Sequence, residues 1–166
     1  MIKNVILALL IALPLSVFAQ KFGVVETEPV LTSMPEYAAM QTQVNEASKK
    51  YEDELNKLKE EMNKKFTEYQ ALEKDTATPE SIKERRMQEM QELDQKIQQF
   101  TNTAMQDLQR QQQQLMAPIE QKFMDACKAV GQEGGYTFIL PQGMALYVGS
   151  TVEDVTPLIK AKLGIK

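Results

Sequence analysis

The sequence predicts a mainly α-helical protein in which a long antiparallel helical hairpin stands on a small β-rich body. Apolar residues recur with helical spacing over residues 37–72 and again over residues 82–123, and the two stripes match each other in reverse order. Strand and turn chemistry occurs at both ends of this helical region. We therefore expect a helical arm at residues 33–131 and a body formed by residues 20–32 and 132–166.

Residues 1–19 have the pattern of a secretory signal peptide. Lys3 is followed by the apolar run Val5–Val17, and Val17-Phe18-Ala19 suits cleavage after Ala19. At about 13 residues the run is short for a membrane span, although an uncleaved N-terminal anchor is the alternative. We expect export to the periplasm.

The composition argues against an enzyme and against a nucleic-acid-binding protein. The chain has no His and no Trp, and it shows no phosphate-binding or zinc-binding motif. We therefore predict no catalytic residue, no cofactor and no metal. Without residues 1–19, the 18 Lys and Arg are outnumbered by 23 Asp and Glu, which disfavours a phosphate backbone as partner. The single Cys127 excludes an internal disulfide and is either a small buried apolar residue or half of an intermolecular bridge.

The first long helix is predicted to begin at a capping box, Ser33-Met34-Pro35-Glu36. From Val44 to Phe66 the apolar steps are 3, 4, 4, 3, 4 and 4 residues, which is an eleven-residue repeat. This period predicts a seam that runs nearly straight or drifts right-handed.

Residues 74–79 interrupt the stripe. Thr78 suits the N-cap of a second helix, Pro79 suits its first position, and Gly131 suits its end.

The two stripes can be paired, because facing residues of an antiparallel hairpin have numbers with a constant sum. Leu58 with Ile97 gives 155, and Tyr51 with Ala104 gives the same sum. Four further pairs share it: Leu55–Phe100, Met62–Leu93, Ala47–Leu108 and Met40–Leu115. The arm should be roughly 60 Å long.

The body is predicted to contain short strands and one helix. Phe22–Val25 alternates as a strand, and residues 136–140 and 145–148 read as two strands around a hairpin turn at residues 141–144. Thr156-Pro157 would cap a final helix, Leu158–Leu163, that ends at Gly164. So few residues make a thin core, which suggests oligomerisation.

The segments around the hairpin carry a family resemblance. Their order and spacing resemble those of the Skp/OmpH family of periplasmic chaperones. The segments are Lys21–Thr27, Val30-Leu31, Met34–Tyr37, Gly135–Leu140, Ala145–Tyr147, and Asp154–Thr156 with Leu158 and Leu163.

This resemblance implies a jellyfish-like homotrimer in which three arms enclose a cavity and hold unfolded outer-membrane proteins without ATP. The trimer body would include Val24, Tyr136, Phe138, Ile139, Leu146 and Tyr147. The best-known members are basic, whereas residues 35–130 carry 14 basic and 18 acidic side chains here. We therefore expect no strong membrane binding through the arm tip.

Two features of the second helix are candidates for client binding. Between Ile97 and Ile119 only Asp107 and Arg110 are charged, and glutamines such as Gln98, Gln109 and Gln112 fill the polar positions. This neutral face either lines the cavity or is a low-complexity solvated face. Met87, Met105 and Met116 form a line beside the seam, suited either to promiscuous apolar contacts or to packing at the seam edge or against a neighbouring subunit.

Pro118 lies inside the second helix, where it removes a backbone hydrogen bond. It is either a hinge that lets the cavity widen or a tolerated kink.

The function predicted from these features is that of a holding chaperone. The alternative is a structural coiled-coil spacer or tether of the cell envelope.

Overall fold

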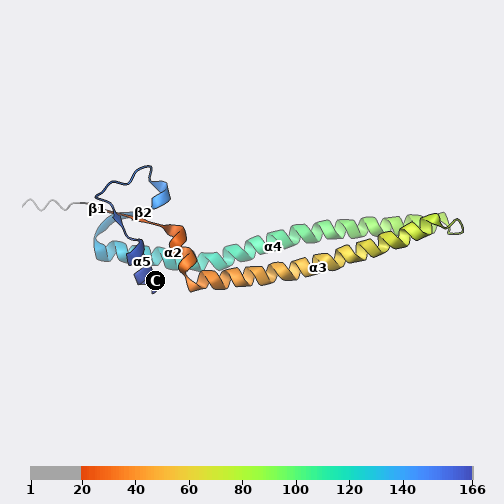
Figure 1. The fold of residues 1–166 in the computed structure, drawn as a ribbon, viewed down its shortest axis with the longest axis horizontal. Helices are drawn as coiled ribbons and strands as arrows, with labels where there is room; N and C mark the ends of the chain where they lie inside the picture. The colour runs from red at the N-terminus through yellow and green to blue at the C-terminus, as the bar shows by residue number, and fades with distance from the viewer. Residues whose placement is uncertain (1–19, 166) are drawn as a thin grey trace, which may run out of the picture.

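The computed structural model of the chain describes residues 20–165, and the predicted signal peptide lies outside these residues. Figure 1 shows two long helices that extend side by side from a small body. The elements in chain order are β1 (Lys21–Val25), α2 (Thr27–Ser33), α3 (Pro35–Lys74), α4 (Glu80–Gly134), β2 (Tyr136–Pro141), the 3-10 turn η1 (Gln142–Met144), β3 (Glu153–Asp154) and α5 (Thr156–Leu163).

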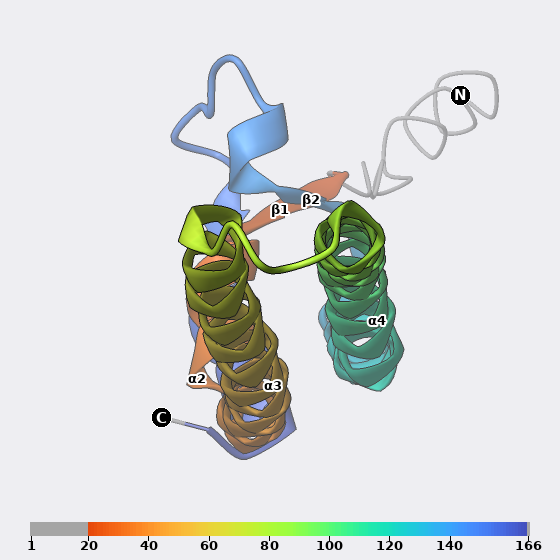
Figure 2. The same ribbon diagram turned by 90° about the vertical axis from the view of Figure 1, so that its right-hand side faces the viewer.

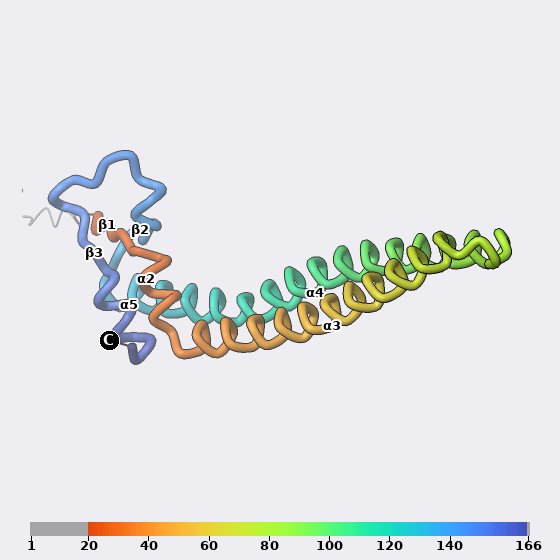
Figure 3. The backbone as a smooth tube through the Cα atoms, turned by 45° about the vertical axis from the view of Figure 1, so that its right-hand side comes forward, coloured from red at the N-terminus to blue at the C-terminus, as the bar shows by residue number. Residues whose placement is uncertain are grey.

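The predicted hairpin is confirmed as α3 and α4, which pack against each other along the arm (Figure 3). Along the arm its buried residues are members of the two predicted stripes: Met40, Leu58, Leu93, Ala104 and Ile119. The other buried residues of α4, Ala126 and Val130, belong to the body. Tyr51 supports the predicted pairing, because its ring lies 5.9 Å from that of Phe100 while its hydroxyl donates to Asp107 at 3.1 Å. These contacts lie one turn on either side of Ala104, the predicted partner of Tyr51.

The seam opens towards the tip. Phe66 and Ile82, both members of the predicted stripes, remain 51% and 44% exposed. The outer part of the arm is therefore held by fewer buried side chains than the part near the body.

The predicted capping box at the start of the arm is wrong. Ser33 is the last residue of α2, and its hydroxyl donates to the carbonyl of Pro29 instead of accepting from α3. Met34 occupies the N-cap of α3 without a side-chain hydrogen bond, and Glu36 pairs with Lys122 across the hairpin. The motif failed because a short helix, α2, forms where the sequence suggested only the β-rich body.

Both predicted ends of the second helix are also displaced. Thr78 donates its hydroxyl to Asp75 at 2.7 Å, and Pro79 is the N-cap of α4. The helix runs past Gly131 to Gly134, where Gly135 at φ 65° provides the left-handed cap. Gly131 lies inside the helix on the side of β2, where Ile139 is about 3.7 Å from the position of a Cβ, an ordinary van der Waals distance.

The sheet is parallel throughout, with the order β2-β1-β3. Gly23 of the central strand pairs with Ile139 on one side and with Glu153 on the other. The predicted hairpin of residues 136–140 and 145–148 is therefore wrong, because a hairpin requires an antiparallel pair and both strand pairs of this sheet are parallel. Instead, residues 142–152 cross from β2 to the opposite edge of the sheet, and residues 145–148 form no strand within the described chain.

Two apolar clusters hold the chain together. The body cluster contains Val25, Val30, Ala126, Val130, Val155 and Ile159. The arm-base cluster contains Met34, Met40 and Ile119. The predicted final helix is confirmed as α5, and Gly164 at φ 73° ends it as predicted. Its predicted start is wrong: α5 begins at Thr156 with Val155 as N-cap, because the Thr156 hydroxyl accepts from the N–H of Glu26 at 3.0 Å instead of capping the helix.

The two faces of the sheet differ in exposure. Tyr136 and Ile139 pack against the body cluster on the face that is covered by helices. Phe138 remains 51% exposed on the other face, where its ring lies 4.8 Å from that of Phe22. Figure 2 shows the crossing segment 142–152 on the far side of the sheet from the arm helices. This segment carries Leu146 and Tyr147, which are almost fully exposed.

Candidate functional site

The described residues, 20–165, offer surfaces rather than a catalytic centre. No helix among them has the length and apolar character needed to cross a membrane. Nor does this part of the chain gather Cys, Asp or Glu into a group that could hold a metal ion. Burial raises the pKa of the Cys127 thiol to about 11, so this thiol stays protonated near neutral pH.

A groove without charged side chains runs along the middle of the arm, and we call it the neutral groove. It has a volume of about 630 Å³. Its lining residues are Val44 from α3 and Asn102, Met105, Gln106, Leu108, Gln109 and Gln112 from α4. Met105 is the most exposed of the apolar ones, at 66%. Methionine and amide side chains suit contacts with varied partners, because the former is flexible and the latter both donates and accepts hydrogen bonds.

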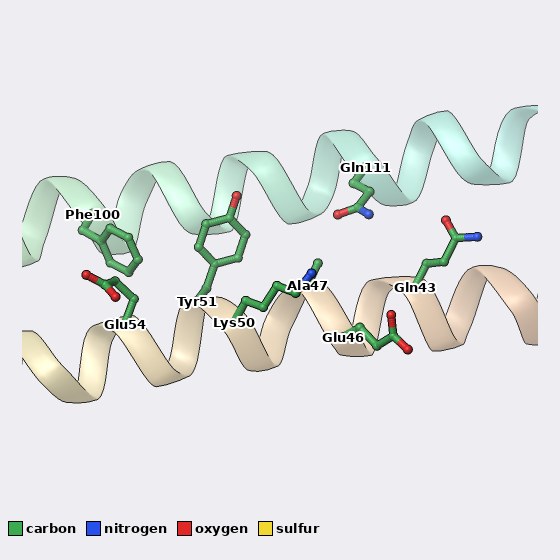
Figure 4. A pocket seen from close by; sticks show the side chains of 8 residues that line it. All are labelled: Gln43, Glu46, Ala47, Lys50, Tyr51, Glu54, Phe100 and Gln111. Atoms are coloured by element: carbon green, nitrogen blue, oxygen red, sulfur yellow. The ribbon is translucent and has the colours of Figure 1, made fainter.

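A second groove, the charged groove, also lies between α3 and α4 at the level of Tyr51 (Figure 4). It has a volume of about 480 Å³. Its lining includes Glu46, Lys50 and Glu54 from α3, together with Gln43, Ala47, Tyr51, Phe100 and Gln111. The arm thus presents an ionic groove and a neutral one.

The two charges within the neutral stretch of α4 neutralise each other. Asp107 pairs with Arg110 and accepts the Tyr51 hydroxyl. That hydrogen bond to a carboxylate raises the pKa of Tyr51. Because Tyr51 lines the charged groove, Asp107 is held towards that groove and no net charge reaches the neutral one.

The position of the body identifies the side on which each groove opens. Residues 18 apart on an α-helix point in the same direction, because 18 residues make five turns. Gln109 of the neutral groove therefore points in the same direction from α4 as Cys127, which lies next to β2. Met105 likewise points as Phe123 does, which packs on the body cluster. Phe100 and Gln111 of the charged groove point almost oppositely. The neutral groove therefore opens towards the side of the arm on which the sheet lies, and the charged groove opens away from it.

The predicted client-binding residues divide into two groups. Met87, Met105, Gln109 and Gln112 are exposed, and the last three share the neutral groove. Gln98 is exposed and donates to Asp94 at 2.7 Å. Met116 is partly buried against the arm-base cluster, so it contributes to packing there.

Four further residues of the neutral groove were not predicted from the sequence: Val44, Asn102, Gln106 and Leu108. The spacing of residues 102, 105, 106, 109 and 112 on one helical face could have identified most of them.

Pro118 lies in an unbroken stretch of α4 close to the arm-base cluster. With Met40, Gln43, Leu115 and neighbouring residues it lines a groove of about 370 Å³. One turn further on, Lys122 forms an ion pair with Glu36 and lowers the pKa of that carboxyl group. The helix is continuous here, and a hinge at Pro118 stays a prediction.

The residues predicted for the trimer body also divide by exposure. Val24 is buried within the chain, whereas Ile139 and Tyr136 are partly buried and pack on its body cluster. Tyr136 also carries Lys21 over its ring at 4.1 Å, and Lys21 pairs with Glu153 at 2.8 Å. Phe138, Leu146 and Tyr147 are exposed.

Comparisons with known proteins agree with the resemblance. Residues 21–163 match the family model described as outer membrane protein (OmpH-like). The fold is similar to the crystal structure of a candidate outer membrane chaperone (OmpH-like) from Caulobacter crescentus CB15. That likeness has a TM-score of 0.73 at 12% sequence identity, and it covers 87% of this chain and 83% of the other. Among curated proteins no match was found.

Proposed function

The chain belongs to the OmpH/Skp-like family of outer-membrane-protein chaperones, and from this premise we propose that it holds unfolded outer-membrane proteins without ATP, inside a cavity between three arms. The family is periplasmic and non-enzymatic. Cleavage after Ala19 would release the mature chain into that compartment.

Assembly through the exposed face of the sheet is the first part of the proposal. Phe138, Leu140, Leu146 and Tyr147 leave a large apolar surface uncovered in the single chain. Such a surface marks an interaction site in a soluble protein. A homotrimer built on this face would cover it.

The relation between the neutral groove and the sheet carries the proposal. The groove opens on the side of the arm where the sheet and its crossing segment lie. Subunits that meet through the exposed sheet face would therefore turn their neutral grooves towards the shared axis and their charged grooves outwards. An inner surface of Met, Asn and Gln can contact the apolar segments and unpaired backbone groups of an unfolded client. Because this surface has no fixed charge, it would neither trap nor repel client segments according to their own charge.

Replacing two exposed methionines tests the proposal: Met105 of the neutral groove and Met87, which lies 18 residues earlier on α4 and points in the same direction. Met87 and Met105 changed together to Gln keep helix propensity. Each lost partial contact should be worth about 0.5–1.5 kcal/mol, which weakens binding of an unfolded outer-membrane β-barrel protein about tenfold. Native mass spectrometry and a binding titration measure assembly and affinity, and the trimer mass and melting temperature should not change.

Met124 provides the matched control. It is 46% exposed on the same helix but points about 100° away from the direction shared by Met87 and Met105, so Met124→Gln should leave client affinity unchanged. Unchanged affinity in the Met87 and Met105 variant would contradict the proposal. A complete loss of partner binding on reversing Lys83, Arg85 and Arg86 at the tip would instead favour the tether.

A further inference from the structure

The arm and the body have separate apolar clusters, and few residues join them. The body cluster is built mainly from β1, α2, α5 and the last turns of α4. The arm-base cluster is built from Met34, Met40 and Ile119, where α3 begins. Because α4 runs unbroken from the arm into the body, the direction of the arm depends on how this helix bends and on the side chains that contact both clusters.

Leu163 and Ile165 are the two residues that pack against both clusters within residues 20–165. Both are partly buried. They come from the end of α5 and the residue just beyond it, so they reach the arm base from the body side.

The end of α5 is shaped to place Ile165 there. Gly164 adopts φ 73°, a left-handed conformation that glycine adopts without a steric penalty. The N–H of Ile165 then donates to the carbonyl of Lys160 at 3.0 Å, and the N–H of Gly164 donates to that of Ala161 at 3.1 Å. This pair of hydrogen bonds is a Schellman motif, which turns the chain back after the helix.

We propose that Leu163 and Ile165 act as a wedge that fixes the angle between the arm and the body. The wedge lies beside the part of α4 that contains Pro118, where a backbone hydrogen bond is missing. An arm of roughly 60 Å amplifies small changes at its base, so a rotation of about 10° would move the tip by roughly 10 Å. These residues are positioning residues for the neutral groove, and the inference holds whatever the groove binds.

Distance measurements between two spin labels test the wedge. One label is placed at Glu61 on the arm and the other at Lys128 in the body, both exposed positions, in a Cys127→Ser background. The labelled full-length chain is diluted with unlabelled chain so that each assembly carries at most one label pair. Ile165→Ser should broaden the distance distribution at least about twofold, and Ile165→Val should restore most of the original width.

Leu158→Ser is the matched control, because Leu158 lies on α5, as the wedge residue Leu163 does, but is 44% exposed and belongs to neither cluster. Its distance distribution should match that of the parent chain. Equal widths in the Ile165→Ser variant and the parent would overturn the inference. Equal broadening in Ile165→Ser and Leu158→Ser would overturn it too, because α5 as a whole would then be responsible. Ile165→Ala provides the same comparison should the serine variant fail to fold.

Discussion

Two neighbouring residues of β2 should give opposite phenotypes, because their side chains point to opposite faces of the sheet. Phe138 is 51% exposed on the face proposed for assembly, whereas Ile139 packs against the body cluster of its own chain. Phe138→Thr keeps the β propensity of the strand while removing the exposed ring. Ile139→Ala shortens a core side chain.

The magnitudes follow from these exposures. A phenylalanine side chain buries about 150–250 Å², so the exposed half offers about 100 Å² to a partner. At about 25 cal/mol per Å² this is an upper limit of about 2.5 kcal/mol for each subunit. Three subunits together lose about 7.5 kcal/mol, or about five powers of ten in the trimer association constant. Ile139→Ala should cost each chain about 2 kcal/mol and lower its melting temperature by about 4–8 °C.

Sedimentation over a wide concentration range, together with thermal unfolding, separates the two effects. Phe138→Thr should move assembly to concentrations up to about three hundredfold higher, because the association constant of a trimer scales with the square of the concentration. Its single chain should lose only about 1 kcal/mol, from the contact with Phe22. Ile139→Ala should remain trimeric at concentrations where the parent chain is trimeric. The reverse pattern, with dissociation in Ile139→Ala and none in Phe138→Thr, would refute both the assignment of faces and the proposed assembly surface.

Three further predictions concern the arm and the thiol. Cysteines at Leu58 and Ile97 in a Cys127→Ser background should crosslink within one chain, whereas efficient crosslinking of Leu58 to Leu108 would disprove the pairing. Client affinity should depend only weakly on salt, because residues 35–130 carry 14 basic and 18 acidic side chains and the neutral groove has no charge. A steep loss of affinity between low and high salt in a binding titration would show that clients are bound mainly by electrostatic attraction. Since burial raises the pKa of Cys127 from 9.0 to about 11, about a hundredfold less thiolate is present at pH 8. Alkylation by iodoacetamide should therefore be about a hundredfold slower in the folded protein than in urea, and equal rates would show that the thiol is accessible and unperturbed.

The hairpin could be predicted because its determinants are local and periodic. Apolar residues such as Leu58 and Leu93 repeat along each helix, and two stripes of matching spacing have one natural way to pair. The end of the final helix could also be predicted, because Gly164 adopts the left-handed conformation that ends it, whereas Thr156 lies within its first turn and does not cap it.

The sheet could not be predicted in the same way, because its pairing partners are distant in sequence. Residues 145–148 have the composition of a strand, yet β2 pairs with β1, and the other edge of β1 is taken by Glu153 and Asp154. Nothing local to residues 136–148 distinguishes a hairpin from a parallel crossover. The prediction for Ser33 was wrong for a related reason. Its hydroxyl can either accept from the start of α3 or donate to the carbonyl of Pro29, and the formation of α2 favours the second.

The face on which a side chain lies was only partly predictable. Met87, Met105 and Met116 lie along one line of α4, but Met116 reaches the arm-base cluster because Met34 and Met40 pack beside it. The side of the arm on which the charged residues of the first helix lie was not predicted from the sequence. The structure places Glu46, Lys50 and Glu54 in the charged groove, on the side of the arm opposite the neutral groove.

The parallel sheet has a consequence for how the chain folds. Lys21 pairs with Tyr136, so β1 can enter the sheet only when a segment 115 residues later in the chain reaches it. Closing so long an unstructured loop is slow and entropically costly. Formation of the hairpin removes most of this cost, because zipping α3 against α4 brings the two ends of the loop together. A chain that emerges from a membrane N-terminus first would complete its arm before its body. The edge of β1 would stay open during this time, and a mispaired arm would delay or misalign the closure of the sheet.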